Sequence, residues 1–325
     1  MREMLWRAAK SGLAGLAVLS LFAGLQPAAA QDKLKIAVGG QRGVGETFPP
    51  EIGQKAGIFK KNGLDLEIFY TEGTGETLQA VISGAAQVGL GTGFAGTLGP
   101  ISKGAPVRII GASFTGGSQL YWYVKANSPI KSVKDAEGRT VAYSTAGSSA
   151  YASVMALQKF SGVNFKMTAT GSTPSTFAAV MSGQVDVGWA GAPFGLEALQ
   201  KGDIRLVWKA SAAPDMDKQT IRVLIARADE LKAKPDVYAR YIRAHRQTQE
   251  WVASTPEGLK AYAEWANLSE AAAKTALTEF LPSAAIDPYR IAGVDDVMDD
   301  AVRMKFLPGR LTEAQLKDAI QVPPR

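Results

Sequence analysis

The sequence has no cysteine and a single histidine, His245. Without cysteine, disulfides, thiol nucleophiles, iron–sulfur clusters and zinc-finger sites are excluded. One histidine cannot form a multi-histidine metal site, and any Ser-His-Asp triad would have to use His245. We therefore expect no metal, no cofactor and no catalytic residue, and we predict that the chain is not an enzyme.

Neither sign of charge dominates the chain. Lys and Arg number 36 against 30 Asp and Glu, which gives the 325-residue chain a formal net charge of +6. The basic residues form no stripe, and this argues against nucleic acid as a partner. The 34 glycines and 16 prolines are spread along the chain, so the composition is that of a globular protein.

Residues 1–30 have the pattern of a secretory signal peptide. Three basic residues precede an apolar run over residues 11–25, and three alanines end at Ala30. The apolar run is shorter than the roughly 20 residues that span a bilayer. We expect cleavage after Ala30 and export to the periplasm, without a lipid anchor because no cysteine stands at the cleavage point.

Two later segments repeat each other without a gap. TGETLQAVISGAAQVG at residues 74–89 and TPSTFAAVMSGQVDVG at residues 173–188 are identical at eight of sixteen positions. Each has apolar residues at helical spacing, then Ser-Gly, a common helix end, and then a short apolar strand. The repeat predicts two similar halves.

Each half has the pattern of a βαβαβ unit followed by a further helix and strand, which predicts a mostly parallel sheet. Segments 119–125 and 220–227 are predicted to be crossover strands that form a hinge, beside Gly/Ser/Ala-rich stretches at 113–118 and 210–218. Helices are predicted at 49–60 and 149–160 in the two halves and, in the C-terminal third, at 235–254, 256–267, 269–281, 294–306 and 312–321.

The predicted fold class is α/β, with two doubly wound lobes joined by a two-strand hinge and with extra C-terminal helices packed on the first lobe. Lobe I would comprise residues 31–116 and 217–325, and lobe II residues 117–216, with a ligand cleft between them.

Several segments, taken together, carry a family resemblance. They are KLKIAVGG at 33–40, KAGIFKKNGLDLEI at 55–68, LQAVISGAAQVGLG at 78–91, SKGAPVRIIGA at 102–112, SPIKSVKDAEGRTVAY at 128–143 and VMSGQVDVGWAGAP at 180–193. The chain resembles the periplasmic substrate-binding proteins of the nitrate, sulfonate and taurine ABC transporters. The resemblance implies a type II periplasmic-binding-protein fold, hinge closure on a small molecule and delivery to a membrane-embedded ABC permease. We expect a monomer.

Ligands of parallel α/β sheets bind outside the carboxyl ends of strands, where helix N-termini converge. Six strand-to-helix turns should therefore face the cleft: 39–48, 72–77 and 91–97 in lobe I, and 144–149, 170–175 and 189–194 in lobe II. The predicted ligand-binding residues in these turns are Gly40, Gln41, Arg42, Thr74, Thr92, Gly93, Ser144, Ser148, Ser149, Thr173, Trp189 and Ala192.

Some of these residues have competing interpretations. Arg42 either clamps a carboxylate or sulfonate or is a solvated loop arginine paired with Glu46. The hydroxyl residues bind an anion or cap their own helices. Trp189 is either a wall of the site, which would favour an organic ligand, or part of the core.

The sequence predicts an exported solute-binding protein that captures a small organic anion, such as a sulfonate, a taurine-like molecule or a carboxylate, for an ABC importer. The alternative is a binder of a neutral heterocycle such as a thiamine-pyrimidine precursor. A periplasmic enzyme on the same fold fits the pattern less well. A receptor that serves a sensor would have the same cleft and fits the pattern no better.

Overall fold

The computed structural model describes residues 31–43 and 45–325, so the predicted signal peptide and its cleavage point lie outside the described residues. The strands are β1 (Asp32–Gly39), β2 (Leu64–Thr71), β3 (Val88–Gly93), β4 (Val107–Thr115), β5 (Leu120–Lys125), β6 (Thr140–Tyr143), β7 (Lys166–Ala169), β8 (Gly188–Gly191), β9 (Ile204–Lys209) and β10 (Thr220–Arg227).

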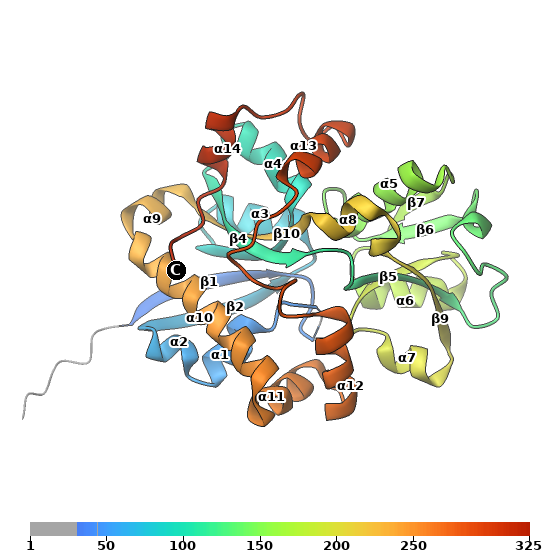
Figure 1. Cartoon of the computed structure of the whole chain (residues 1–325), viewed down its shortest axis with the longest axis horizontal. Coiled ribbons are helices and arrows are strands. Elements are labelled where there is room, and N and C mark those ends of the chain that lie inside the picture. The colour runs from blue at the N-terminus through green and yellow to red at the C-terminus, as the bar shows by residue number, and fades with distance from the viewer. Residues whose placement is uncertain (1–30, 44) are drawn as a thin grey trace, which may run out of the picture. The chain divides into compact units, whose positions relative to one another are not determined.

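The helices alternate with these strands and then dominate the C-terminal third (Figure 1). They are α1 (Pro49–Lys55), α2 (Ile58–Lys61), α3 (Thr74–Ile82), α4 (Phe94–Ser102), α5 (Ser149–Ser161), α6 (Thr173–Ser182), α7 (Leu196–Lys201), α8 (Pro214–Lys218), α9 (Ala228–Ala233), α10 (Pro235–Ser254), α11 (Pro256–Ala266), α12 (Glu270–Thr275), α13 (Val294–Arg303) and α14 (Glu313–Ala319).

The first sheet has the strand order β2-β1-β3-β10-β4, in which β1 is parallel to β2 and β3 and β10 is antiparallel to both its neighbours. Alternate residues of β10 face opposite sides. Val223 and Ile225 pack in the core under α3, α4 and α13, whereas Leu224 and Ala226 pack in the core under α2 and α10. Burial on both faces explains why β10 is a continuous apolar run from Val223 to Ala226, whereas the edge strand β2, which is only partly buried, alternates apolar with charged residues in its first half.

The second sheet repeats this topology. Strand β6 is parallel to β7, β5 lies antiparallel between β8 and β9, and a parallel bridge between Val141 and Val187 joins the two groups. The resulting order β7-β6-β8-β5-β9 matches β2-β1-β3-β10-β4 strand for strand. The repeat at residues 74–89 and 173–188 thus marks equivalent parts of the two sheets, α3–β3 and α6–β8, as predicted.

Two local predictions differ from the structure. The segments expected as crossover strands become β5 and β10, which lie inside the two sheets, so the connections between the sheets are instead the stretches 116–119 and 210–219, the second of which contains α8. The single helix expected at 49–60 is divided into α1 and α2, because Gly57 takes the left-handed backbone conformation with φ 74°.

The C-terminal helices occupy their predicted places. Thr255, Ser269 and Thr312 cap α11, α12 and α14 through their side-chain oxygens, as their positions predicted. Helix α10 packs on α1 and α2, and α13 packs on α4, so both cover the first sheet. The last residue of the π-helical turn Ala276–Phe280 instead contacts Tyr121 of β5, so this region also touches the second sheet.

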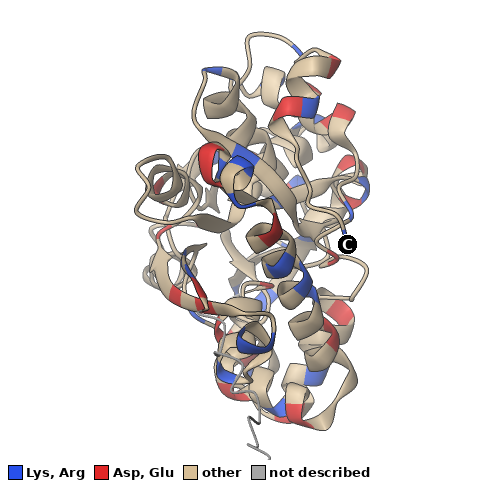
Figure 2. Cartoon of the chain, turned by 90° about the vertical axis from the view of Figure 1, so that its left-hand side faces the viewer, with Lys and Arg blue, Asp and Glu red and all other residues tan. Residues whose placement is uncertain are grey.

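The described residues include no helix that combines the length and the apolar character of a membrane span. Positive and negative side chains are mixed along the helices, and Figure 2 shows Lys and Arg interspersed with Asp and Glu on the face it displays.

The only histidine is a core residue rather than a surface one. His245 of α10 is 1% exposed and lies beside Tyr241, with ring centroids 6.0 Å apart. Neither ring nitrogen has a hydrogen-bond partner among the described residues. Burial lowers the pKa of His245 to about 3, because the charged imidazolium would be desolvated.

This burial predicts acid sensitivity. Below pH 6.5 the histidine of the unfolded chain, with a pKa near 6.5, binds a proton, whereas the folded His245 stays neutral until about pH 3. The contribution of His245 to the free energy of unfolding is therefore fully present above about pH 6.5 and falls as the pH drops toward 3. Between pH 7.5 and 5 we expect a loss of about 2 kcal/mol from this group. Urea unfolding at the two pH values measures it. His245→Phe should remove most of the difference, and an unchanged difference in that variant would assign the acid sensitivity to other groups.

Candidate functional site

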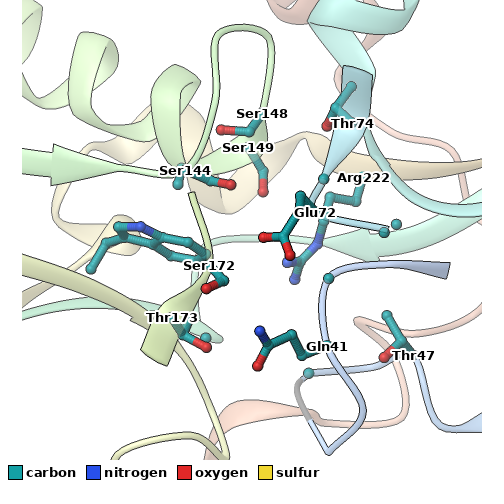
Figure 3. Close-up of a pocket in the computed structure, with 18 of the residues that line it drawn as sticks. Gln41, Thr47, Glu72, Thr74, Ser144, Ser148, Ser149, Ser172, Thr173 and Arg222 are labelled. Atoms are coloured by element: carbon teal, nitrogen blue, oxygen red, sulfur yellow. The ribbon is translucent and has the colours of Figure 1, made fainter. Parts of the chain in front are cut away.

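A small cavity of about 60 Å³ lies where the carboxyl ends of the parallel strands of both sheets meet (Figure 3). All six predicted turns contribute to this central cavity. Its lining is Gly39, Gly40, Gln41, Gly45, Glu46, Thr47, Glu72, Gly73, Thr74 and Gly91 from the first-sheet turns, Ser144, Ser148, Ser149, Ala150, Gly171, Ser172, Thr173, Trp189 and Gly191 from the second-sheet turns, and Arg222 from β10.

The second-sheet side of the cavity is built from two helix N-termini. Ser148 caps α5, its Oγ accepting a hydrogen bond from the Tyr151 N–H at 3.1 Å. Ser172 caps α6 in the same way through the Ser175 N–H at 3.4 Å. Each helix N-terminus carries about half a positive charge. This wall therefore offers hydroxyls and a positive potential without a charged side chain.

The first-sheet side is held by threonines and glycines. Thr74 is the first residue of α3, and its Oγ1 accepts a hydrogen bond from the Gly93 N–H at 3.0 Å. Gly73 precedes it with φ 155°, and a Cβ there would lie 3.5 Å from the Ser144 Oγ of the opposite wall. The turn thus brings α3 close to the second-sheet serines.

A buried ion pair forms part of the lining. The Arg222 Nη2 lies 2.9 Å from Glu46 Oε2, with the two side chains 13% and 1% exposed. Glu46 also accepts hydrogen bonds from Ser113 Oγ at 2.8 Å and Gln119 Nε2 at 3.0 Å. Burial lowers the pKa of Arg222, and the Glu46 carboxylate opposes that shift.

Arg222 was missed by the sequence reasoning, which looked only at turns after parallel strands. A signal was available, because Arg222 is the one charged residue inside the apolar strand TIRVLIA. A cation at an interior strand position must be paired or must serve a site. The structure shows the pairing and places the guanidinium at the cavity.

Trp189 lines the cavity and is 9% exposed. It belongs to β8, where it pairs with Trp122 of β5. Its indole Nε1 is buried and has no hydrogen-bond partner among the described residues. A buried donor without a partner at a cavity wall can donate to a bound molecule.

The structure brings eight of the predicted ligand-binding residues to the cavity: Gly40, Gln41, Thr74, Ser144, Ser148, Ser149, Thr173 and Trp189. Arg42 is not among them. Its Nε donates to Glu51 Oε1 at 2.7 Å and its Nη1 to the Trp265 carbonyl at 3.2 Å, on the side of α1 and α11. The pairing with Glu46 proposed as its alternative role is also wrong, since Glu46 pairs with Arg222.

Three other predicted residues lie outside the lining. Thr92 and Gly93 belong to β3, which runs further than expected; Thr92 Oγ1 donates to the Val223 carbonyl at 3.3 Å, and Gly93 packs against the Gly147 backbone. Ala192 is fully buried, and its carbonyl accepts a hydrogen bond from Gln119 Nε2 at 3.3 Å. The described residues contain no group of three or more potential metal ligands.

A family model described as NMT1/THI5 like matches residues 50–259, more than half of the chain. The chain belongs to the NMT1/THI5-like family. Among curated proteins, no sequence matches it. The matched region contains both repeat segments and every predicted turn from 72 onward, so this family membership confirms the resemblance found in the sequence.

Solved structures similar to this NMT1/THI5-like chain establish the periplasmic-binding-protein fold. The alkanesulfonate-binding protein SsuA from Xanthomonas axonopodis pv. citri, bound to MOPS, has a TM-score of 0.74 and 17% identity, covering 90% of this chain and 100% of its own. The periplasmic nitrate-binding protein NrtA from Synechocystis PCC 6803 has a TM-score of 0.68 and 14% identity, covering 89% and 85%. The desulfurization enzyme DSZB has a TM-score of 0.61 and 14% identity, covering 88% and 96%.

Proposed function

We propose that this NMT1/THI5-like protein is an exported, monomeric solute-binding protein that captures a small organic anion and delivers it to an ABC permease. The observation that carries the proposal is the second-sheet wall of the cavity, which is lined by two capped helix N-termini and by Trp189, whose buried N–H has no partner among the described residues. Positive helix ends and a buried indole donor together favour an anionic group with an organic body beside it. SsuA binds alkanesulfonates and NrtA binds nitrate, and both of these ligands are anions, which supports an anionic ligand for this protein.

Capture would work by closure of two lobes, residues 31–116 with 217–325 and residues 117–216. Contacts between them support a closed state. The Arg303 Nη1 donates to the Met155 carbonyl at 3.3 Å, and the rings of Phe306 and Tyr151 lie 6.1 Å apart. A ligand that touches both walls of the cavity stabilises the closed form, and a permease can distinguish it from the open one.

A binding role without catalysis fits the chemistry of the lining, although DSZB shows that the fold also hosts an enzyme. His245 is a buried residue of α10 and does not line the cavity, and the Glu46 carboxylate is paired with Arg222 and accepts hydrogen bonds from Ser113 and Gln119. The predicted signal peptide supports a periplasmic location.

A thermal-shift panel on the purified protein tests the proposal. The panel comprises taurine, ethanesulfonate, nitrate, benzoate, propionate and 4-amino-5-hydroxymethyl-2-methylpyrimidine. An anion present at 100 times its Kd should stabilise the protein by about 2.7 kcal/mol. If only the neutral pyrimidine stabilises the protein, the ligand is a neutral heterocycle and not an organic anion. If no compound of the panel shifts the melting temperature, the result counts against the proposal.

Replacing Trp189 by Phe keeps an aromatic wall and removes the indole N–H. A hydrogen bond to a charged group contributes about 1.5–3 kcal/mol, so we expect the affinity for the best anion of the panel to fall at least tenfold. Isothermal titration measures it. Trp208→Phe is the matched control, since the Trp208 Nε1 is also buried and unpartnered but does not line the cavity. If the two variants bind the anion with equal affinity, the Trp189 N–H does not contact the ligand.

A further inference from the structure

The charged lining of the central cavity is asymmetric. It consists of the carboxylates of Glu46 and Glu72 and the guanidinium of Arg222. Glu46 and Arg222 neutralise each other in their buried ion pair. The cavity is thus left with a formal excess of one negative charge, and that charge belongs to Glu72.

Glu72 has no role in holding the fold together. It lies in the turn between β2 and α3, and its carboxylate makes no hydrogen bond or ion pair with any residue that the structure describes. Only its backbone N–H is bonded, to Glu76 Oε2 at 2.9 Å. Figure 3 shows the Glu72 carboxylate pointing into the pocket, toward the second-sheet serines.

The opposite wall has the reverse polarity. Ser148 and Ser172 cap helices of 13 and 10 residues whose positive ends face the cavity, and the Trp189 N–H beside them has no partner. An anion is favoured at this wall and repelled at Glu72. Glu72 remains exposed at the edge of the cavity, so a simple monoanion bound at the opposite wall would face this charge without a counter-charge of its own.

We infer that the ligand of this site is a small zwitterion. Its anionic head binds the second-sheet wall at Ser149, Ser172 and the Trp189 N–H, and its protonated amine pairs with the Glu72 carboxylate. The inference rests on the proposed function and narrows it. Because the cavity is only about 60 Å³, the two charges are separated by a short spacer. Glu72 is the residue that distinguishes an amino-substituted anion from its unsubstituted analogue.

Two matched pairs of probes test this inference by isothermal titration: taurine against ethanesulfonate, and β-alanine against propionate. Within each pair only the amine differs. We expect the wild-type protein to bind the aminated member of at least one pair ten or more times tighter. In Glu72→Gln that preference should disappear, with the aminated probe weakened about tenfold and the simple anion bound as well as or better than by the wild type.

Glu76→Gln is the matched control, because it removes one negative charge a single turn away, outside the cavity lining, and its amide oxygen can still accept the Glu72 N–H. It should keep the wild-type preference. Equal binding of both members of each pair to the wild type, or a preference that survives in Glu72→Gln, overturns the inference and leaves the proposed function standing. Failure of all four probes also overturns it, while the wider anion panel decides the proposed function separately.

Discussion

Replacing Arg222 by Met should destabilise the protein by about 3–5 kcal/mol. The substitution leaves the Glu46 carboxylate, which is 1% exposed, without its cation inside the protein. Breaking one side of a buried pair costs far more than the net contribution of the pair, because the remaining charge is desolvated and unpaired. Urea unfolding at pH 7.5 measures the change in the free energy of unfolding.

The double variant Glu46→Gln with Arg222→Met is the control. It removes both charges, and Ser113 and Gln119 can still hydrogen-bond the amide that replaces the carboxylate. We expect it to recover most of the lost stability. A single variant within about 1 kcal/mol of the wild type would mean that the fold tolerates the unpaired Glu46 carboxylate and that the ion pair contributes little to stability.

Replacing Gly96 by Ala should weaken ligand binding at least tenfold without destabilising the unliganded protein. A Cβ at this position of α4 would lie 2.4 Å from the Gly147 carbonyl oxygen and 2.6 Å from the Gly147 Cα, on the opposite lobe. Backbone atoms cannot move aside as a flexible side chain can, so the methyl group keeps the lobes apart. Within α4 itself, Ala is a better helix former than Gly.

Isothermal titration with the best anion of the panel and small-angle scattering with and without that anion measure the effect. The wild-type radius of gyration should fall on binding, and that of Gly96→Ala should not. Gly75→Ala is the matched control, because Gly75 also lies in a helix, α3, and has no atom of a neighbouring segment within 4 Å of its would-be Cβ. Normal affinity in Gly96→Ala would contradict a closure that brings these backbones together.

Local patterns predicted much of the site because each strand-to-helix turn is a local feature. The side chain that caps a helix, such as Ser148 or Ser172, lies next to that helix in the sequence. The carboxyl ends of parallel strands meet at one edge of a sheet whatever the side chains are. The six turns were therefore found without knowing which elements are neighbours.

The failures concern contacts between distant segments. Arg42 is held away from the cavity by the Trp265 carbonyl, 223 positions along the chain; packing of this C-terminal helix on the first lobe was predicted, but no local pattern predicts its contact with Arg42. Thr92 is turned toward β10 by the pairing of β3 with a strand more than a hundred residues later. Arg222 reaches the cavity only because β10 crosses back between β3 and β4.

Local sequence patterns suffice to predict the fold class, the internal repeat, the capped helices and the six turns, because periodicity, capping and turn chemistry act over a few residues. The charge of the site depends instead on contacts that form only in the folded chain. The pairing of Glu46 with Arg222, and with it the isolation of Glu72, depends on which strand lies beside which, and that is settled by burial of apolar faces across the whole chain.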